Sequence, residues 1–230
     1  DGTTIIHNAA KEPEITDLAK CLQEMGAKIV GAGTDTITIY GVKKLHKAKH
    51  SLIADRIEAG TYAVAAAITK GDLTLTNVSP QILTSVIAQL REIGVQVEEE
   101  QNSFRVIGTG SNINPTKINT SPYPSFPTDM QAQMMALLST AGGTSHINET
   151  IFENRYMHVP ELNRMGAKIS VNDNLAVIEG TSELRGAEVM ATDLRASVCL
   201  VLAALAADGE TLINRVYHLD RGYEHLEEKL

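Results

Sequence analysis

The sequence predicts a mixed α/β protein whose helices lie inside and whose sheets lie outside, and three observations support this fold class. Four segments that open on a glycine and continue into a strand pattern recur at intervals of about 70 residues. An amphipathic helix pattern follows each of these strand patterns. Between repeats lies a second helix pattern that is apolar on nearly every side, so other elements have to cover it all round.

Each repeat begins with a strand. The four opening segments are "GTTIIHN" from Gly2, "GDLTLTN" from Gly71, "GTSHINE" from Gly143 and "GETLINR" from Gly209. In three repeats the amphipathic helix ends on a glycine suited to the left-handed conformation, namely Gly26, Gly94 and Gly166. An alternating strand, a turn and a second strand follow, and the predicted second strands are residues 36–40, 104–107 and 175–178. One unit is therefore β-α-β-β followed by β-α.

The apolar helices lie between the repeats, in "ADRIEAGTYAVAAAIT", "TDMQAQMMALLSTA" and "TDLRASVCLVLAALAA". Their alignment places Asp55, Asp129 and Asp193 at the start of the three helices. An aspartate there can cap free N–H groups and complement the helix dipole. Capping explains all three residues, and most plainly Asp55. Asp129 also follows a proline-rich loop, "SPYPSFP", so a chemical role stays open beside capping.

Three arginines recur near predicted helix starts. Counting from the repeat glycines places Arg155 and Arg221 at equivalent positions, and Arg195 lies two residues after Asp193. Helix N-termini and guanidinium groups both favour phosphate and carboxylate. Each arginine alone could instead form a surface ion pair of little energetic value. Their recurrence indicates a site for an anionic small molecule, with a carboxylate available for acid–base chemistry.

The composition makes several function classes unfavourable. The chain has 230 residues, a formal net charge of -8 and no tryptophan, and its longest Lys/Arg run is Lys43-Lys44. We therefore expect neither a nucleic-acid partner nor a membrane-surface role. No apolar run has the length of a transmembrane helix, and no signal peptide is recognisable.

The cysteines and histidines give weaker indications. Cys21 and Cys199 lie within predicted helices among apolar residues, so we expect buried free thiols, which fit a cytoplasmic location. His46 and His50 are spaced as on one helix face, but the sequence around them holds no carboxylate or cysteine. We expect solvated histidines there rather than a metal site.

Four runs together carry a resemblance to a known family: "FPTDMQAQ", "ETIFENRYMHVPEL", "ATDLRAS" and "HLDRGYE". Over its whole length the chain resembles the enolpyruvyl transferases, and the first two runs resemble the members that use UDP-N-acetylglucosamine. The resemblance implies an inside-out α/β barrel built of repeated β-α-β-α-β-β units in two domains, with substrates in the cleft. Residues 1–53 would complete the first domain, and residues 54–230 would form most of the second.

The resemblance also implies that the chain is the C-terminal part of a longer enzyme. The start at a strand and the stop within the helix pattern of residues 224–230 agree with this expectation. The missing N-terminal part would supply a Lys-Asn pair and a mobile loop with a cysteine or aspartate. Neither Cys21 nor Cys199 matches that cysteine, and we expect the truncated chain alone to be inactive.

The reaction implied by the resemblance transfers the enolpyruvyl group of phosphoenolpyruvate to the 3-hydroxyl of UDP-N-acetylglucosamine, with release of phosphate. It is the first committed step of peptidoglycan synthesis. No metal or organic cofactor is implied. The implied roles are Asp129 as base, Arg221 at phosphoenolpyruvate, Asp193 and Arg195 in the same pocket, Arg155 as a supporting arginine, and the main chain of Ile151 at the amino sugar.

Other interpretations remain at this stage. One is another enolpyruvyl transferase, such as the shikimate-pathway type, although "FENRYMHVPEL" follows the amino-sugar pattern. A second is a catalytically silent chain that binds sugar nucleotide, against which stands the joint presence of Asp129, Arg195 and Arg221. A third is a structural repeat domain, which explains the repeats but not the recurring charges.

Overall fold

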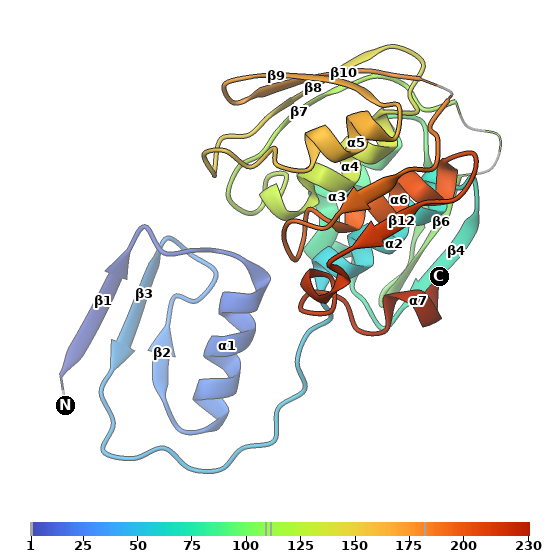
Figure 1. The fold of residues 1–230 in the computed structure, drawn as a ribbon. Helices are drawn as coiled ribbons and strands as arrows, with labels where there is room; N and C mark the ends of the chain where they lie inside the picture. Colours follow the sequence, from blue (N-terminus) through green and yellow to red (C-terminus); the bar gives the residue numbers. More distant parts are fainter. Residues whose placement is uncertain (1, 109, 111, 182) are drawn as a thin grey trace. The chain divides into compact units, whose positions relative to one another are not determined.

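The computed structural model describes residues 2–108, 110, 112–181 and 183–230, which form two compact units (Figure 1). Unit 1 comprises the residues up to Ala54 together with Pro122–Ser125. Unit 2 comprises Asp55–Ser121 and Phe126–Leu230. Each unit has its own packed residues and is considered by itself.

Unit 1 is a three-stranded antiparallel sheet with one helix. The strand order is β1-β3-β2. The helix begins at Pro13, in the first turn, where a backbone N–H group would have no partner within the helix. Gly26 follows the end of the helix with a φ of 98°. A small core of Ala19, Ile29 and Ile37 joins the helix to the sheet. The elements are β1 (Thr3–His7), α1 (Pro13–Glu24), β2 (Lys28–Val30) and β3 (Thr36–Tyr40).

The segment that follows β3 packs against α1 through a histidine. His50 places Nε2 3.0 Å from the Asp17 carboxylate and Nδ1 3.3 Å from the Glu24 carboxylate. The expectation of a solvated histidine is therefore wrong for His50, because the acids that contact it come from residues distant in sequence. His46 is exposed as expected, and the segment that holds both histidines is not helical.

Removing the imidazole of His50 should cost stability mainly at acidic and neutral pH. Hydrogen bonds to Asp17 and then Glu24 raise the pKa of His50, with burial opposing them. The contribution is therefore complete below the ordinary histidine pKa of about 6.5 and disappears as pH rises through the raised value. Chemical unfolding of wild type and His50→Gln at pH 6 and pH 9 tests this. A difference in unfolding free energy that is equal at both pH values would contradict it.

Three buried helices form the centre of unit 2 (Figure 1). They are α2 (Arg56–Ile68), α4 (Gln131–Leu138) and α6 (Val198–Ala206). Every residue of α4 is buried, and the three helices pack against one another. The nearly all-round apolar surfaces of these segments require this environment. The prediction of helices inside and sheets outside is confirmed.

In the part of unit 2 that the structure describes, three sheets surround these helices (Figure 1). One is antiparallel with strand order β4-β6-β5, and another has the order β7-β8-β10-β9, with β7 parallel to β8. A parallel pair, β11-β12, forms the third. The alternating pattern buries one face, as at Ile147 and Ile178. The strands are β4 (Asp72–Thr76), β5 (Gln96–Glu99), β6 (Ser103–Ile107), β7 (Lys117–Asn119), β8 (Thr144–Asn148), β9 (Lys168–Asn172), β10 (Leu175–Glu179), β11 (Glu188–Met190) and β12 (Leu212–Asn214).

The two predicted amphipathic helices of unit 2 each pack against a strand, α3 (Thr84–Glu92) against β5 and α5 (Val159–Arg164) against β9. As predicted, Gly94 and Gly166 follow them with φ values of 98° and 94°, in the left-handed region that glycine accepts without a Cβ penalty. The remaining elements are η1 (Pro80–Leu83), η2 (Thr128–Met130), η3 (Val216–His218) and α7 (Leu226–Lys229).

The predicted helix starts need correction. Asp55 directly precedes α2, but Asp129 lies in the 3-10 turn η2 and Asp193 lies in a turn before α6. Arg155 lies in the loop between β8 and α5, and Arg221 lies in a turn between η3 and α7, so neither is the first residue of a helix. Repeat spacing located the segments correctly, but it could not distinguish a helix from the turns that lead into it.

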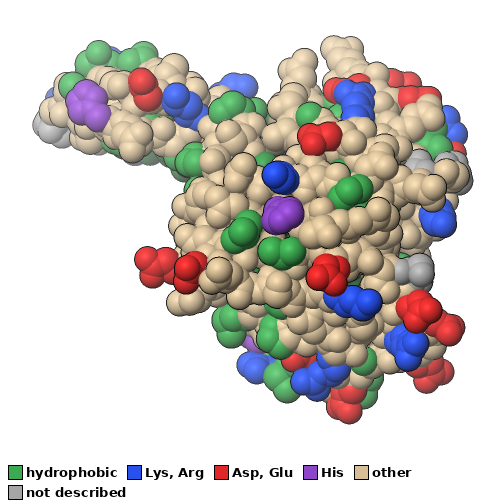
Figure 2. Space-filling model, turned by 90° about the horizontal axis from the view of Figure 1, so that it is seen from above, with side chains coloured by type: hydrophobic (Ala, Val, Ile, Leu, Met, Phe, Trp, Pro, Cys, Tyr) green, Lys and Arg blue, Asp and Glu red, His purple; other side chains and the backbone are tan. Residues whose placement is uncertain are grey.

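The surface carries charges of both signs. Figure 2 shows basic and acidic side chains interspersed on the visible face, in line with the absence of a long basic run in the sequence. Across the described residues, every helix falls short of the length and apolar character that crossing a membrane requires.

Candidate functional site

A hollow of about 520 Å³ in unit 2 collects four of the predicted site residues, Asp129, Arg155, Asp193 and Arg195. They come from η2 before α4, the loop after β8 and the turn before α6. The N-terminal ends of two central helices therefore face this region, and their partial positive charge favours an anionic ligand.

Asp129 and Arg155 form the central ion pair of this hollow. Arg155 donates from Nη2 to Oδ1 of Asp129 at 2.6 Å and from Nη1 to the hydroxyl of Thr128 at 2.8 Å. Its guanidinium carbon also lies 4.9 Å from the centre of the Phe152 ring. The Arg155 side chain is 16% exposed, whereas that of Asp129 is 40% exposed. Arg155 is thus held on three sides, while the carboxylate it neutralises stays accessible to a ligand.

Asp129 does not cap a helix, so the capping interpretation is wrong for this residue. The described turn η2 has no side-chain cap. By contrast, Asp55 accepts hydrogen bonds from the N–H groups of Ile57 and Glu58 at 2.8 and 3.1 Å. Aspartates at corresponding repeat positions therefore have different partners. Asp55 accepts from backbone N–H groups at the start of its helix, whereas the Asp129 carboxylate accepts from Arg155.

Asp193 stabilises the turn that leads into α6. Its Oδ1 accepts from the N–H groups of Arg195 and Ala196 at 2.7 and 2.6 Å. In return, Ser197 accepts from the N–H group of Asp193 at 2.9 Å. This reciprocal arrangement resembles a capping box and fixes the backbone of the "TDLRAS" run at the hollow.

Arg195 is engaged by groups from both ends of unit 2. It donates to Oδ2 of Asp55 at 2.8 Å and to the carbonyl of Gly222 at 2.9 Å, and its guanidinium lies 5.5 Å from the centre of the Tyr223 ring. Burial alone raises the pKa of Asp55, but Arg195 and the two capping N–H groups outweigh it, so the net shift is downward. Asp55 therefore both caps α2 and holds Arg195.

Two predicted site residues lie outside the hollow. Ile151 does not line it, and its N–H group donates to Glu149 at 2.8 Å. Arg221 is exposed and lines a separate hollow that also includes Glu58 and Asp220. The roles expected of Ile151 and Arg221 stay predictions.

Sequence reasoning missed two buried polar residues beside the hollow. Glu149, directly after β8, is 1% exposed and accepts several hydrogen bonds. His158 is also 1% exposed, and burial lowers its pKa to about 4, with Asp193 opposing the shift and Arg155 adding to it. Both residues lie within the run "ETIFENRYMHVPEL", but the sequence analysis assigned neither of them a role, because nothing in the run shows that they are buried.

The cysteines agree only in part with expectation. Cys199 is fully buried in α6, and burial raises the pKa of its thiol well above the ordinary value. Cys21 is only partly buried. A thiol held in its neutral form is a poor nucleophile, so Cys199 is a packing residue.

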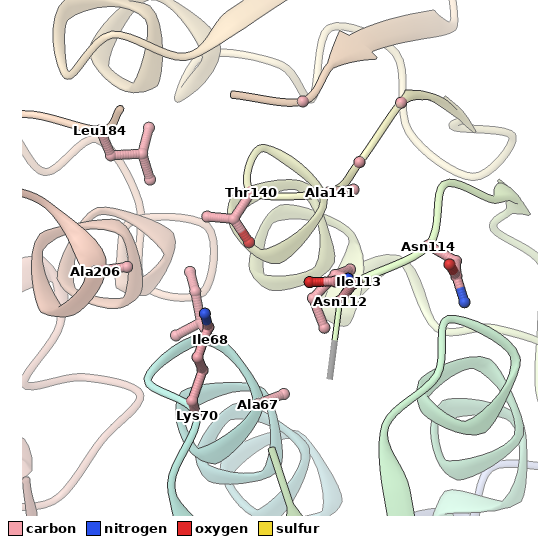
Figure 3. Close-up of a pocket in the computed structure, with 13 residues that line it drawn as sticks. Ala67, Ile68, Lys70, Asn112, Ile113, Asn114, Thr140, Ala141, Leu184 and Ala206 are labelled. Carbon is pink, nitrogen blue, oxygen red and sulfur yellow. The ribbon is translucent and has the colours of Figure 1, made fainter. Parts of the chain in front are cut away.

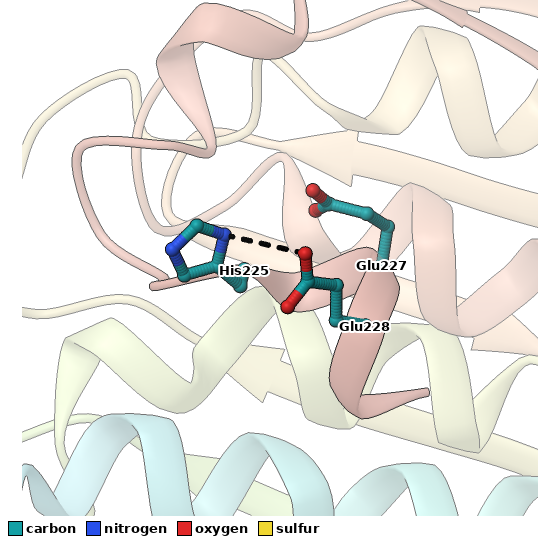
Figure 4. A group of neighbouring side chains, drawn as sticks. All are labelled: His225, Glu227 and Glu228. Atoms are coloured by element: carbon teal, nitrogen blue, oxygen red, sulfur yellow. Dashed lines mark ion pairs between the residues drawn. The ribbon is translucent and has the colours of Figure 1, made fainter.

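Within the described residues, the one group with metal-ligand spacing is His225, Glu227 and Glu228, whose ligand atoms lie within 4.8 Å of one another (Figure 4). All three side chains are exposed on and beside the four-residue helix α7. Exposed acidic groups of this kind are ordinary surface features.

A second hollow lies at the C-terminal ends of the three central helices (Figure 3). Residues from α2, α4 and α6 or just beyond them line it, including Lys70, Thr140 and Ala206. Among the described residues, its lining holds no carboxylate and no histidine. Of these two hollows, the one that contains Asp129 is therefore the better candidate for acid–base chemistry.

Comparison with known proteins gives a consistent result. The sequence model of EPSP synthase (3-phosphoshikimate 1-carboxyvinyltransferase) matches residues 1–230. A UDP-N-acetylglucosamine 1-carboxyvinyltransferase from Paramagnetospirillum magneticum is 61% identical over 230 residues, which are 100% of this chain and 53% of that relative. A UDP-N-acetylglucosamine 1-carboxyvinyltransferase from Allorhizobium ampelinum is 59% identical over 229 residues, and the match covers 53% of that relative. The chain spans about half the length of these curated relatives.

Solved structures show the same fold. The enolpyruvyl transferase NikO from Streptomyces tendae superposes with a TM-score of 0.90 at 30% identity, covering 100% of this chain and 55% of that one. An EPSP synthase from Acinetobacter baumannii gives a TM-score of 0.73 at 19% identity, over 97% of this chain and 55% of that one, which concerns the fold alone. Both similarities support the predicted fold class.

Proposed function

Since the chain belongs to the EPSP synthase family, we propose that it is the C-terminal part of an enolpyruvyl transferase acting on UDP-N-acetylglucosamine. The common name of the curated relatives supports the acceptor, and the share of those relatives that the chain covers supports its being a part. The reaction transfers the enolpyruvyl group of phosphoenolpyruvate to the sugar 3-hydroxyl and releases phosphate. It would begin peptidoglycan synthesis in the cytoplasm and so serve cell-wall formation, cell shape and division.

The chemistry is an addition followed by an elimination. The methylene carbon of phosphoenolpyruvate takes a proton, and the sugar hydroxyl attacks the neighbouring carbon as it loses its own proton. The tetrahedral adduct then loses a proton from the new methyl group, and the C–O bond to phosphate breaks. A base beside the hydroxyl and cations around the phosphate and carboxylate assist both stages.

Asp129 carries this proposal. Its carboxylate is accessible and is held by Arg155 at 2.6 Å, with no helix N–H group competing for it in the described turn. In this role Asp129 takes the proton of the sugar hydroxyl. Arg155 positions the carboxylate, while Asp193 and Arg195 form the adjoining wall of the hollow. Ile151 contributes its main chain to the amino sugar, and no metal or organic cofactor takes part.

The remaining groups of the cleft belong to the N-terminal part of the enzyme. Residues 1–53 complete the domain that begins there, and residues 54–230 form most of the second domain. The upstream part brings the Lys-Asn pair and the loop with a cysteine or aspartate. The partners of this protein are small-molecule substrates. Neither nucleic acid nor a membrane is among them.

Phosphate release by the full-length protein tests the proposal. We expect release only when both phosphoenolpyruvate and UDP-N-acetylglucosamine are present, and a sugar nucleotide product that carries the enolpyruvyl ether. Omission of either substrate is the control. Release with 3-phosphoshikimate in place of the sugar nucleotide would assign the chain to the other branch of the family.

Arg221→Ala should weaken the handling of phosphoenolpyruvate more than that of the sugar nucleotide. The side chain is exposed and lies next to Gly222 and Tyr223, which hold Arg195, so it can approach an anion without breaking a buried contact. We expect KM for phosphoenolpyruvate to rise about tenfold or more, as for the loss of one charge-assisted hydrogen bond. Arg185→Ala, which removes an exposed pair with Glu183, is the control. An unchanged KM for phosphoenolpyruvate would exclude this role.

A further inference from the structure

We propose that Glu149 is a positioning residue that sets the place of Arg155 and, through Arg155, the orientation of the Asp129 carboxylate. The kinetic part of this inference rests on the proposed function, whereas its geometric part does not. Glu149 does not line the hollow and would not touch a substrate there. It acts through the residues that do.

Glu149 is a buried acceptor at the end of β8. Its side chain is 1% exposed in the structure, so each of its oxygen atoms needs a donor from the protein. Oε1 accepts from the hydroxyl of Thr120 at 2.8 Å and from the N–H groups of Ile151 and Phe152 at 2.8 and 3.2 Å. Oε2 accepts from the hydroxyl of Thr128 at 2.8 Å. A carboxylate, which only accepts, matches four donors without conflict.

The bond to Thr128 fixes the direction of the contact with Arg155. A threonine hydroxyl has a single proton, and Thr128 donates this proton to Glu149. Its lone pairs therefore face Nη1 of Arg155, which donates to it at 2.8 Å, while Nη2 reaches Asp129 at 2.6 Å. Glu149, Thr128, Arg155 and Asp129 thus form one chain of polarised hydrogen bonds.

The other oxygen of Glu149 constrains Arg155 from a second side. By accepting from the N–H groups of Ile151 and Phe152, it closes the turn after β8. The Phe152 ring in that turn lies 4.9 Å from the guanidinium carbon of Arg155. One carboxylate therefore holds both the hydroxyl that Arg155 donates to and the ring that it stacks on.

The competing explanation is that Glu149 only closes a loop. Thr120 and Thr128 distinguish the two explanations, because both donate to Glu149 at 2.8 Å but only Thr128 continues to Arg155. Thr120 also accepts from the N–H of Thr150, so its loss should cost at least as much stability. The two threonines are a matched pair that differs in the connection to the site.

The experiment compares Thr128→Val, Thr120→Val and Glu149→Gln in the full-length protein. We expect Thr128→Val and Glu149→Gln to lower kcat by about 10- to 100-fold, the usual effect of misplacing a catalytic group. The double variant Thr128→Val/Glu149→Gln should be no slower than Glu149→Gln, because both break the same chain. Thr120→Val should keep kcat within about threefold of wild type, and Thr128→Ser should restore most of the activity. Equal losses of kcat for Thr120→Val and Thr128→Val, in parallel with stability, would overturn the inference.

A crystal structure of the Thr128→Val variant gives the second readout, which does not depend on turnover. We expect the 2.6 Å contact between Arg155 and Asp129 to be lost or displaced, with the Thr120–Glu149 contact retained. An unchanged Arg155–Asp129 contact would overturn the inference whatever the kinetics show. If the wild-type protein releases no phosphate from the two substrates, the proposed function fails, while this comparison still decides the role of Glu149.

Discussion

Asp129→Asn in the full-length protein should reduce turnover by about 10³-fold or more while the fold stays intact. General base catalysis contributes on this scale, and asparagine cannot take a proton from the sugar hydroxyl. The amide oxygen can still accept from Arg155, whose bond to Asp129 measures 2.6 Å, so the geometry of the hollow should survive. Initial rates of phosphate release and thermal unfolding by circular dichroism measure the two effects separately.

Asp72→Asn is the matched control for this variant. Asp72 also forms a 2.6 Å ion pair with an arginine, Arg105, but on the exposed surface of the β4–β6 sheet. We expect its replacement to leave turnover unchanged, because exposed pairs of this kind contribute little. Near-normal phosphate release by a folded Asp129→Asn variant would remove Asp129 from the role of base.

Acidification should destabilise the protein through His158, by about 3 kcal/mol between neutral pH and pH 4. Burial lowers the pKa of this histidine from 6.5 to about 4; Asp193 opposes the shift and Arg155 adds to it. In the unfolded chain the imidazole would take up a proton near pH 6.5, so the unfolded state binds more protons below that value. Its contribution is therefore complete above pH 6.5, falls as the pH is lowered, and levels off below about 4.

Denaturant unfolding of wild type and His158→Gln at several pH values between 4 and 7.5 tests this prediction. The variant has no imidazole to protonate, so the difference in unfolding free energy from wild type should shrink or reverse as the pH falls. Carboxylates titrate in the same range, but they are present in both proteins and cancel in the difference. A difference that stays constant from pH 7.5 to pH 4 would show that His158 is not buried in its neutral form.

Most of the fold could be predicted because its signals are local. The glycine at each strand start, the glycines that end three helices, and the apolar surface of α2, α4 and α6 follow from spacing along the chain. A helix without a polar face has to be buried wherever it occurs, so helices inside and sheets outside followed without any knowledge of contacts. Helix starts were less predictable, because a turn and the first turn of a helix have similar sequences.

The site was predictable only in outline. Recurrence and neighbouring sequence indicated Asp129, Arg155, Asp193, Arg195 and Arg221. The structure places the first four around one hollow and Arg221 in another. Repeat position alone assigned the same capping task to every aspartate, whereas the partners come from remote segments. Asp129 faces an arginine from the loop after β8, and Asp55 holds an arginine 140 positions further along the chain.

The buried polar groups show the difference most clearly. Glu149 and His158 lie within the run "ETIFENRYMHVPEL", but in the sequence they resemble ordinary surface residues. Their importance arises only when folding removes water from around them, so that each polar atom depends on the protein groups that surround it. Spacing along the chain is sufficient to predict which segments are buried. The donor that reaches a buried carboxylate, and the arginine it then positions, depend on chain segments that only the folded structure brings together.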